Sequence, residues 1–151
     1  MKALVLEATW DPKPGYVVSE FEKRTGKAVV GNSLYKAPRL AVKDVPLPTV
    51  GPKDVLLKIR ACGVCGSDIH MLETDQENYV LYPGLMKLPV ATGHEFSGVV
   101  QEVGREVKDL QVGDIVTVEE MIWCGECKPC RGGFVNQCVN LEEIGFTIDG
   151  A

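Results

Sequence analysis

The stretch "GHEFSGVVQEVG", residues 93–104, joins two polar residues to a strand-like run. Its valines, bounded by glycines, are typical of a β-strand. His94 and Glu95 stand immediately before that run, and burial of the Glu95 carboxylate would be costly without a metal, a cation or a proton beside it. The stretch therefore predicts a core strand with a polar site at its beginning.

Four further runs of the same kind predict that strands dominate the fold. They are "KALVLEA", "RLAVKDV", "DVLLKIRAC" and "DIVTVEEMIW", separated by clusters of Gly, Pro and Asp. A short helix is expected near residues 67–73, with Ser67 or Asp68 as its N-cap. Residues 11–38 mix Pro, Gly and charge, and we expect an irregular or hairpin insertion between two core strands there. The pattern indicates a β-rich α+β fold, either a barrel or a sandwich.

Composition limits the classes of partner. The 151 residues are 45% hydrophobic and 25% charged, which is typical of one globular domain with a core. The net charge is -5 and no run of Lys or Arg occurs, so neither nucleic acid nor a membrane surface is expected as a partner.

The N-terminus lacks the pattern of a secretory signal, which predicts a cytoplasmic protein. The chain stops at Ala151 just after a strand-like run and a turn, so we expect it to be part of a longer protein.

The segment "CGECKPCRGGFVNQC", residues 124–138, is the densest cysteine pattern in the chain. Its cysteines are separated by two, two and seven residues, and they are Cys124, Cys127, Cys130 and Cys138. Four thiolates on tight turns match a structural zinc site, in which every coordination position is filled by protein. An iron–sulfur cluster, buried free thiols, disulfides and a redox pair are the alternatives.

A second group of polar residues offers metal ligands of mixed type. Cys65 lies in "ACGVCGSDIH", residues 61–70, and together with His94 and Glu95 it would fill part of a catalytic zinc shell that keeps an open position. Ser67, Asp68 and His70 follow within a few positions. The chain has two histidines, and both occur in these motifs. Cys62 is expected to be an ordinary strand residue.

These motifs resemble a known family. The pattern Gly-His-Glu, two residues, Gly, five residues, Gly is similar to the zinc signature of medium-chain alcohol and polyol dehydrogenases, and "CGVCGSDIH", "VGDIVTVEE" and the cysteine loop follow the family's order. The resemblance covers residues 1–10 and 39–151. It implies a catalytic, GroES-like domain, which is a partly open β-barrel, and a separate Rossmann domain for NAD or NADP. No Gly-x-Gly-x-x-Gly turn follows a strand here, so the Rossmann domain is expected to be absent from this chain.

The resemblance also implies a role for each residue of the second group. Cys65 and His94 match catalytic zinc ligands, Glu95 matches a glutamate that can join the metal, and a third ligand, Cys or Glu, would lie beyond Ala151. The cysteine loop matches the family's structural zinc site.

The remaining matches concern proton movement and orientation. Asp68 matches the carboxylate that orients the ligating histidine. Ser67 matches the hydroxyl that takes the proton of the substrate alcohol, and His70 the outer member of that relay. Gly66 stands where many alcohol dehydrogenases have Arg or His, whereas polyol and threonine dehydrogenases frequently have Gly.

The loop between the two histidines bears on the substrate. Its candidate partners for substrate hydroxyls are Glu73, Asp75, Glu77, Asn78 and Tyr79, although these could equally belong to an ordinary solvated loop.

We expect the full-length protein to be a homodimer or homotetramer. It would oxidise a secondary alcohol of a polyol, sugar or cyclitol to a ketone by hydride transfer, using zinc and NAD or NADP. This chain alone would be inactive. The alternatives are a small-alcohol or threonine dehydrogenase of the same family, and a non-catalytic zinc-binding interaction module.

Overall fold

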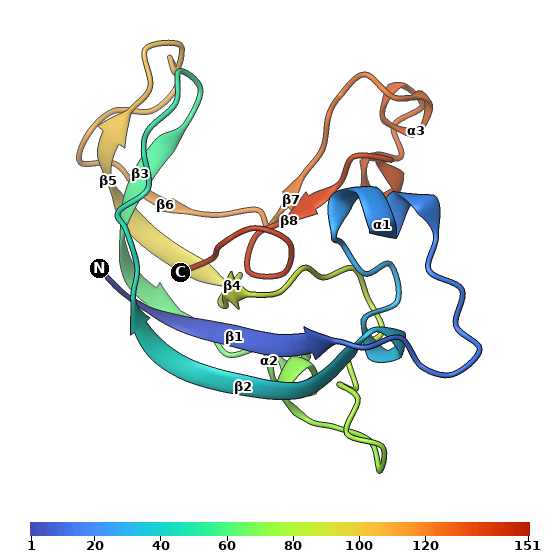
Figure 1. Cartoon of the computed structure of the whole chain (residues 1–151). Coiled ribbons are helices and arrows are strands. Elements are labelled where there is room, and N and C mark those ends of the chain that lie inside the picture. Colours follow the sequence, from blue (N-terminus) through green and yellow to red (C-terminus); the bar gives the residue numbers. More distant parts are fainter.

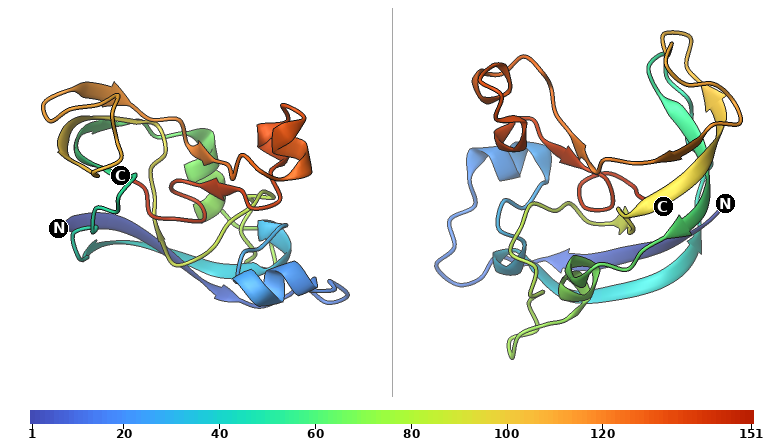
Figure 2. Two further views of the ribbon diagram at one scale, coloured as in Figure 1. Left: turned by 90° about the horizontal axis from the view of Figure 1, so that it is seen from above. Right: turned by 180° about the vertical axis from the view of Figure 1, so that it is seen from behind.

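Two curved three-stranded sheets form the body of the molecule and enclose a partly open barrel (Figures 1 and 2). The computed structural model describes residues 1–151. The first sheet has the order β2 (Tyr35–Asp44), β1 (Lys2–Trp10), β4 (Val90–Ala91), and the second has the order β3 (Val55–Cys62), β5 (Phe96–Val103), β6 (Ile115–Thr117). A small ribbon pairs β7 (Met121–Ile122) with β8 (Glu142–Glu143). All the strand pairs are antiparallel, and the expected strand-rich fold is confirmed.

The helices are short and lie at the ends of the strands. They are α1 (Glu20–Thr25), α2 (Gly66–Leu72) and α3 (Lys128–Arg131), with 3-10 turns η1 (Gly31–Ser33) and η2 (Val135–Gln137). The helix expected near residues 67–73 is therefore present as α2. No helix combines the length and the apolar character that a bilayer crossing requires.

Residues 11–34 connect the paired strands β1 and β2 and contain helix α1, whereas the last residues of the expected insertion, 35–38, belong to β2. The composition of the segment did not predict this helix, because six residues are too few to show a helical period. A capping box begins the helix: Ser19 Oγ accepts from the Glu22 amide at 3.2 Å, and Glu22 Oε2 accepts from the Ser19 amide at 2.8 Å. Glu22 is buried, and its second oxygen accepts from Tyr16 Oη and from the Val29 amide. Local hydrogen bonds therefore fix the beginning of helix α1, which the apolar pattern of the sequence does not indicate.

This segment also contributes to the main core. That core consists of buried side chains drawn from distant parts of the chain, namely Leu6, Ala28, Leu34, Tyr35, Met71, Val80, Met86 and Phe146. Ala28 and Leu34, which come from residues 11–38, are completely buried. Lys27 is nearly buried as well, where it pairs with Glu142 and donates to the Leu141 carbonyl at 3.2 Å. The segment is therefore packed into the domain and also tied to residues 141–142, which follow the cysteine loop.

The pairing of β3 with β5 brings the two sequence motifs together. Cys62, at the end of β3, stands opposite Phe96, at the beginning of β5. One residue further on, the Gly63 amide donates to the Glu95 carbonyl at 2.8 Å. Residues that follow β3 consequently lie beside residues that precede β5, so the start of α2 faces the turn at 92–95.

That turn depends on Gly93. Its φ of +101° is one that residues with a side chain rarely adopt, and a Cβ there would lie 2.9 Å from Cys62 Sγ and 3.1 Å from the Ala151 carbonyl oxygen. The Ala151 amide donates to the Gly93 carbonyl at 3.2 Å. The C-terminal residues therefore pack directly on the backbone that leads into His94.

Replacing Gly93 by alanine should lower the free energy of unfolding more than the same change at Gly113. Gly113 has a similar φ of +99° but no atom within 4 Å of a Cβ, so Gly113→Ala incurs only the backbone strain of about 1–2 kcal/mol. Gly93→Ala adds a steric clash, which we expect to cost about 1–3 kcal/mol more. Urea unfolding followed by tryptophan fluorescence measures both variants. Equal losses in the two would show that the close approach at Gly93 contributes nothing.

Candidate functional site

The four loop cysteines converge on one point. Their sulfur atoms all lie within 4.8 Å of one another. The Sγ atoms of Cys127 and Cys130 are 3.3 Å apart, and those of Cys124 and Cys138 are 3.6 Å apart. A disulfide would need about 2.05 Å, so these are free thiols. Sulfurs bound at about 2.3 Å around one tetrahedral ion are about 3.8 Å apart, close to the separations found here.

The backbone of the loop donates hydrogen bonds to its sulfur atoms. The amides of Cys124 and Asn140 both donate to Cys138 Sγ at 3.3 Å. Backbone N–H groups, first that of Cys130 and then that of Val139, lower the pKa of Cys127 to about 6. A multi-iron cluster would place its own iron and sulfide atoms between the cysteines and hold them wider apart. The donor set and its spacing therefore fit a single zinc ion, bound by protein on all four sides.

A second set of possible ligands lies where α2 begins and β5 begins. One ligand atom each from Cys65, His94 and Glu95 falls within 4.8 Å of the others. Cys65 is the N-cap of α2, and His94 and Glu95 occupy the turn before β5. His94 is 6% exposed, whereas Glu95 is exposed. Sulfur, nitrogen and oxygen donors of this mixture suit zinc and leave a coordination position for another molecule.

The two ring nitrogens of His94 face different surroundings. Nδ1 lies 3.5 Å from Asp68 Oδ1, and both atoms are buried without another hydrogen-bond partner. Nε2 lies 3.4 Å from Ser67 Oγ and 3.9 Å from Glu120 Oε2. The other oxygen of Asp68 accepts from the Cys65 amide at 2.9 Å, which fixes the carboxylate at the start of α2. With its proton on Nδ1 toward Asp68, the ring would present the Nε2 lone pair to a metal.

A cavity of about 440 Å³ opens at this point. Its lining residues are Cys65, Ser67, Tyr82, His94, Glu95, Val118, Glu119, Glu120 and Phe146. Four of the residues predicted from the sequence, Cys65, Ser67, His94 and Glu95, are thus brought together. Glu119 and Glu120 were not predicted, although the pair of carboxylates directly after the strand run of β6 could have indicated them.

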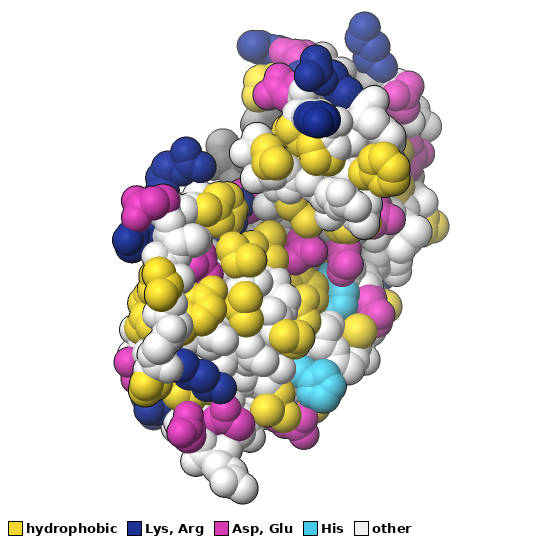
Figure 3. Space-filling view, turned by 90° about the vertical axis from the view of Figure 1, so that its right-hand side faces the viewer, with side chains coloured by type: hydrophobic (Ala, Val, Ile, Leu, Met, Phe, Trp, Pro, Cys, Tyr) yellow, Lys and Arg dark blue, Asp and Glu magenta, His cyan; other side chains and the backbone are white.

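Histidine and acidic side chains share one face of the molecule (Figure 3). His70 is exposed, and its Nδ1 lies 3.4 Å from Glu73 Oε2 rather than in the cavity. Cys62 ends β3, its thiol donates to the Gly63 carbonyl at 3.4 Å, and its sulfur belongs to neither group of possible ligands. It behaves as the strand residue that was expected.

The residues predicted as hydroxyl partners in the 71–93 loop lie outside the cavity. Asp75 pairs with Lys13 at 2.7 Å and accepts from backbone amides. Tyr79 is buried beneath Lys13 and Lys36, whose amines lie 4.7 and 4.9 Å from its ring centre. Glu73, Glu77 and Asn78 are exposed. From this loop only Tyr82 lines the cavity, while contacts with Lys13 and Lys36 hold Asp75 and Tyr79 elsewhere.

Three aromatic rings that line the cavity, those of Tyr82, Phe146 and His94, pack against one another. Phe146 lies 5.2 Å from Tyr82 at an interplanar angle of 26° and 4.6 Å from His94 at 42°. Phe146 is 3% exposed, so its own position is fixed by the core. Burial, together with the charges of Glu143, Glu120 and Cys65, raises the pKa of Tyr82 to about 12. Its hydroxyl therefore keeps its proton at neutral pH.

The four-cysteine loop should retain one tightly held zinc ion per chain after extensive desalting. Cys127→Ser removes one of four sulfur ligands and should release most of that zinc, whereas Cys62→Ser, outside both ligand groups, should not. A colorimetric zinc assay on the purified variants checks this. Iron with acid-labile sulfide in the unmodified protein would contradict the assignment.

The curated relatives of this chain are dehydrogenases. Scyllo-inosose 3-dehydrogenase from Thermotoga maritima is 45% identical over 100% of this chain and 40% of its own length. L-threonine 3-dehydrogenase from Symbiobacterium thermophilum is 41% identical over 78% of this chain and 32% of its own length. The chain therefore spans about two fifths or less of the relatives that it matches.

Solved structures agree with these relatives. A Thermotoga maritima protein assigned to the alcohol dehydrogenases superposes with a TM-score of 0.94 at 43% identity, covering 99% of this chain and 40% of that one. A zinc-binding dehydrogenase from Sinorhizobium meliloti, bound to NADP, gives a TM-score of 0.65 at 30% identity, covering 99% of this chain and 34% of that one. The family model of the alcohol dehydrogenase GroES-like domain matches residues 51–151. The chain is thus a member of the GroES-like alcohol dehydrogenase family, as its motifs indicated.

Proposed function

We propose that residues 1–151 are the catalytic part of a zinc-dependent dehydrogenase that oxidises a secondary alcohol of a polyol, sugar or cyclitol to a ketone, with NAD or NADP as hydride acceptor. The observation that carries this proposal is the convergence of Cys65, His94 and Glu95 on a cavity that Ser67 also lines. These donors fit zinc by their chemistry, and the unpartnered pair His94 Nδ1 and Asp68 Oδ1 fits a ligand histidine held by a carboxylate.

A bound zinc ion would act on the oxygen of the substrate alcohol. Zinc held by Cys65 and His94, with Glu95 beside it, would lower the pKa of an alcohol oxygen and so favour loss of the α-hydride. The protein's own residues would do the rest. Asp68 would fix the orientation of the His94 ring through Nδ1. Its second oxygen, which accepts from the Cys65 amide, would hold Cys65 and His94 in fixed positions relative to each other.

Ser67 is the residue proposed to receive the alcohol proton. Its hydroxyl lies 3.4 Å from His94 Nε2, so it would also lie next to an oxygen bound at that nitrogen's metal. His70 is three residues further along α2 and would share its face of the helix. Its exposed ring, beside Glu73, would pass the proton to solvent.

The lining of the cavity favours uncharged substrates with several hydroxyl groups. Glu95, Glu119 and Glu120 offer carboxylate oxygens that accept hydrogen bonds from hydroxyls. No Lys or Arg is among the lining residues, so the carboxylate of an amino acid such as threonine would have no cationic partner in this part of the site. The similarity to a scyllo-inosose dehydrogenase over the whole chain supports the same choice over the threonine alternative.

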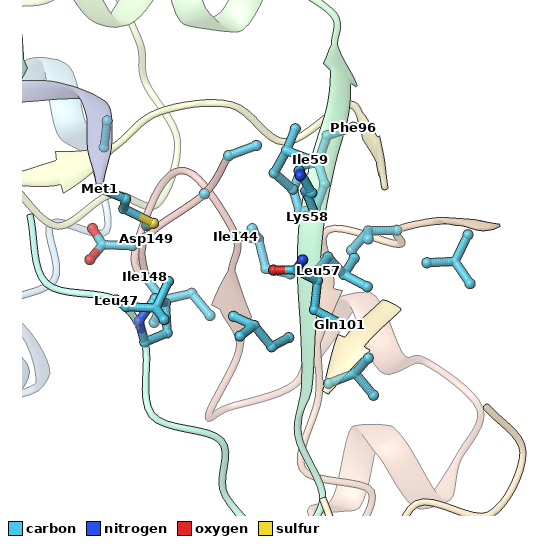
Figure 4. Close-up of a pocket in the computed structure, with 18 of the residues that line it drawn as sticks. Met1, Leu47, Leu57, Lys58, Ile59, Phe96, Gln101, Ile144, Ile148 and Asp149 are labelled. Carbon is cyan, nitrogen blue, oxygen red and sulfur yellow. The ribbon is translucent and has the colours of Figure 1, made fainter. Parts of the chain in front are cut away.

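The domain that binds the nicotinamide cofactor, and the rest of the catalytic domain, would come from further parts of a longer polypeptide. A groove of about 840 Å³ runs between β3 and the C-terminal loop, and its lining is largely apolar, including Leu57, Ile59, Phe96, Ile144 and Ile148 (Figure 4). Exposed apolar surface of this kind is usually covered in the native protein. We infer that the groove is covered by chain outside residues 1–151, which the greater length of the relatives would supply.

Other features of the whole protein follow the family pattern. We infer a cytoplasmic enzyme that forms a homodimer or homotetramer and is inactive without its cofactor domain. A non-catalytic zinc module is the alternative, but it gives no reason for Cys65, Ser67 and His94 to meet at a cavity.

In the full-length protein, Cys65→Ser should abolish alcohol oxidation while leaving the thermal unfolding midpoint nearly unchanged. Cys124→Ser should instead lower the midpoint or disturb assembly, because it breaks a site that is filled by protein ligands. Steady-state reduction of NAD or NADP, together with thermal unfolding, separates the two effects. Equal losses of activity with unchanged stability in both variants would contradict the division between the sites.

Asp68→Asn should lower kcat/KM by about 10–100-fold and also weaken zinc binding at the catalytic site, since the amide no longer holds the His94 tautomer. Asp75→Asn is the matched control, because Asp75 is also a hydrogen-bonded carboxylate but pairs with Lys13 and not with His94. Zinc affinity from competition with a chelator is measured beside kcat/KM. The same loss in both variants would exclude a specific role for Asp68.

A further inference from the structure

Tyr82 is the residue of the cavity whose hydroxyl has no assigned partner. The phenol of Tyr16 donates to Glu22 at 2.8 Å, and that of Tyr35 accepts from the Leu88 amide at 2.9 Å. No hydrogen bond within the chain involves Tyr82 Oη, and the atom is not sealed in the core. Tyr82 is one of the residues that line the cavity, and a phenol without a partner in the chain can donate a hydrogen bond to a bound molecule.

The ring of Tyr82 is nevertheless held firmly. Phe146 stacks on it at 5.2 Å, and the Tyr82 amide donates to the His70 carbonyl at 2.9 Å, which fixes the backbone to the end of α2. Gly84 leaves space for the ring: a Cβ there would be 2.7 Å from Tyr82 Oη and 2.8 Å from Cζ. A hydroxyl on a fixed ring is a group that can select a substrate, because little rotational freedom is lost on binding.

The position of the Tyr82 ring relative to the candidate metal ligand His94 is also defined. Phe146 contacts both Tyr82 and His94, so the stack sets the location of the phenol with respect to the candidate metal ligand. Tyr82 and Glu120 line the same cavity as Ser67. A hydroxyl group next to the reacting carbon could then accept a hydrogen bond from Tyr82 while it donates one to Glu120.

We propose that Tyr82 is a specificity-determining residue that donates a hydrogen bond to a second hydroxyl of a ring polyol. Glu120 is the complementary acceptor for the same substrate. The inference rests on the proposed alcohol oxidation and defines its substrate class, which is uncharged polyhydroxylated rings rather than alcohols with one hydroxyl. A site built to bind a hydroxyl discriminates against an analogue that lacks it, because its own polar groups would otherwise stay unpaired.

The test uses two substrates with the same ring and different numbers of hydroxyls. Full-length, zinc-loaded protein is assayed with myo-inositol and with cyclohexanol, each with NAD and NADP. The unmodified protein should favour myo-inositol, and Tyr82→Phe should lower the ratio of the two kcat/KM values about tenfold, the effect of one lost hydrogen bond. Tyr79→Phe removes a phenol from the same loop but outside the cavity, and it should leave that ratio unchanged.

Binding gives a second readout that does not depend on turnover. Calorimetric titration of myo-inositol into the protein with reduced cofactor should show a similar loss of affinity in Tyr82→Phe. An unchanged ratio in Tyr82→Phe, or a preference of the unmodified protein for cyclohexanol, would overturn the role of Tyr82 and leave alcohol oxidation standing. If neither of these alcohols nor any other polyol, sugar or cyclitol is oxidised with either cofactor, the proposed function is overturned, and the inference with it.

Discussion

The antiparallel pairing of β3 with β5 is the constraint on which the candidate site depends. Its register sets Cys62 opposite Phe96 and so brings the residues that follow one strand beside those that precede the other. Cys65 and His94 are 29 positions apart in sequence, yet each lies only a few residues from this pair. The hydrogen bond from Gly63 to the Glu95 carbonyl continues the ladder into the site itself. A slip of one residue would turn each side chain to the opposite face and separate the ligands.

Two groups of ligands with different properties are built on this frame. The cysteine loop supplies four sulfurs from a single short segment, so its geometry depends mainly on local turns and leaves no position for substrate. The second group draws its donors from two strand ends and opens on a cavity. The positions of these donors depend on tertiary contacts, because Asp68 lies against His94 Nδ1 and Phe146 packs against the His94 ring. The C-terminal residues also fix these positions, through their contact with Gly93 as well as through Phe146.

Much of this arrangement could be predicted from the sequence, because its signals are local. Valine-rich runs predicted the strands, cysteine spacing predicted the converging sulfurs, and the family motifs indicated Cys65, Ser67, His94 and Glu95 together. The helix at 20–25 was missed because a capping box and the buried Glu22 define it rather than a repeating apolar pattern. Tyr82 and Phe146 could not be found from the sequence, since their role comes from stacking between segments 64 residues apart. The polar residues at 73–79 were misleading because loop polarity does not say which way a loop faces.

One chain is proposed to carry a zinc site filled by four sulfurs and a separate, open site at Cys65 and His94. Anomalous diffraction at the zinc edge from crystals of the full-length protein distinguishes the two sites directly. Two peaks per chain are expected, one among the sulfurs of the cysteine loop and one next to Cys65 Sγ and His94 Nε2. A peak at the cysteine loop alone, in zinc-loaded crystals of active protein, would contradict this proposal.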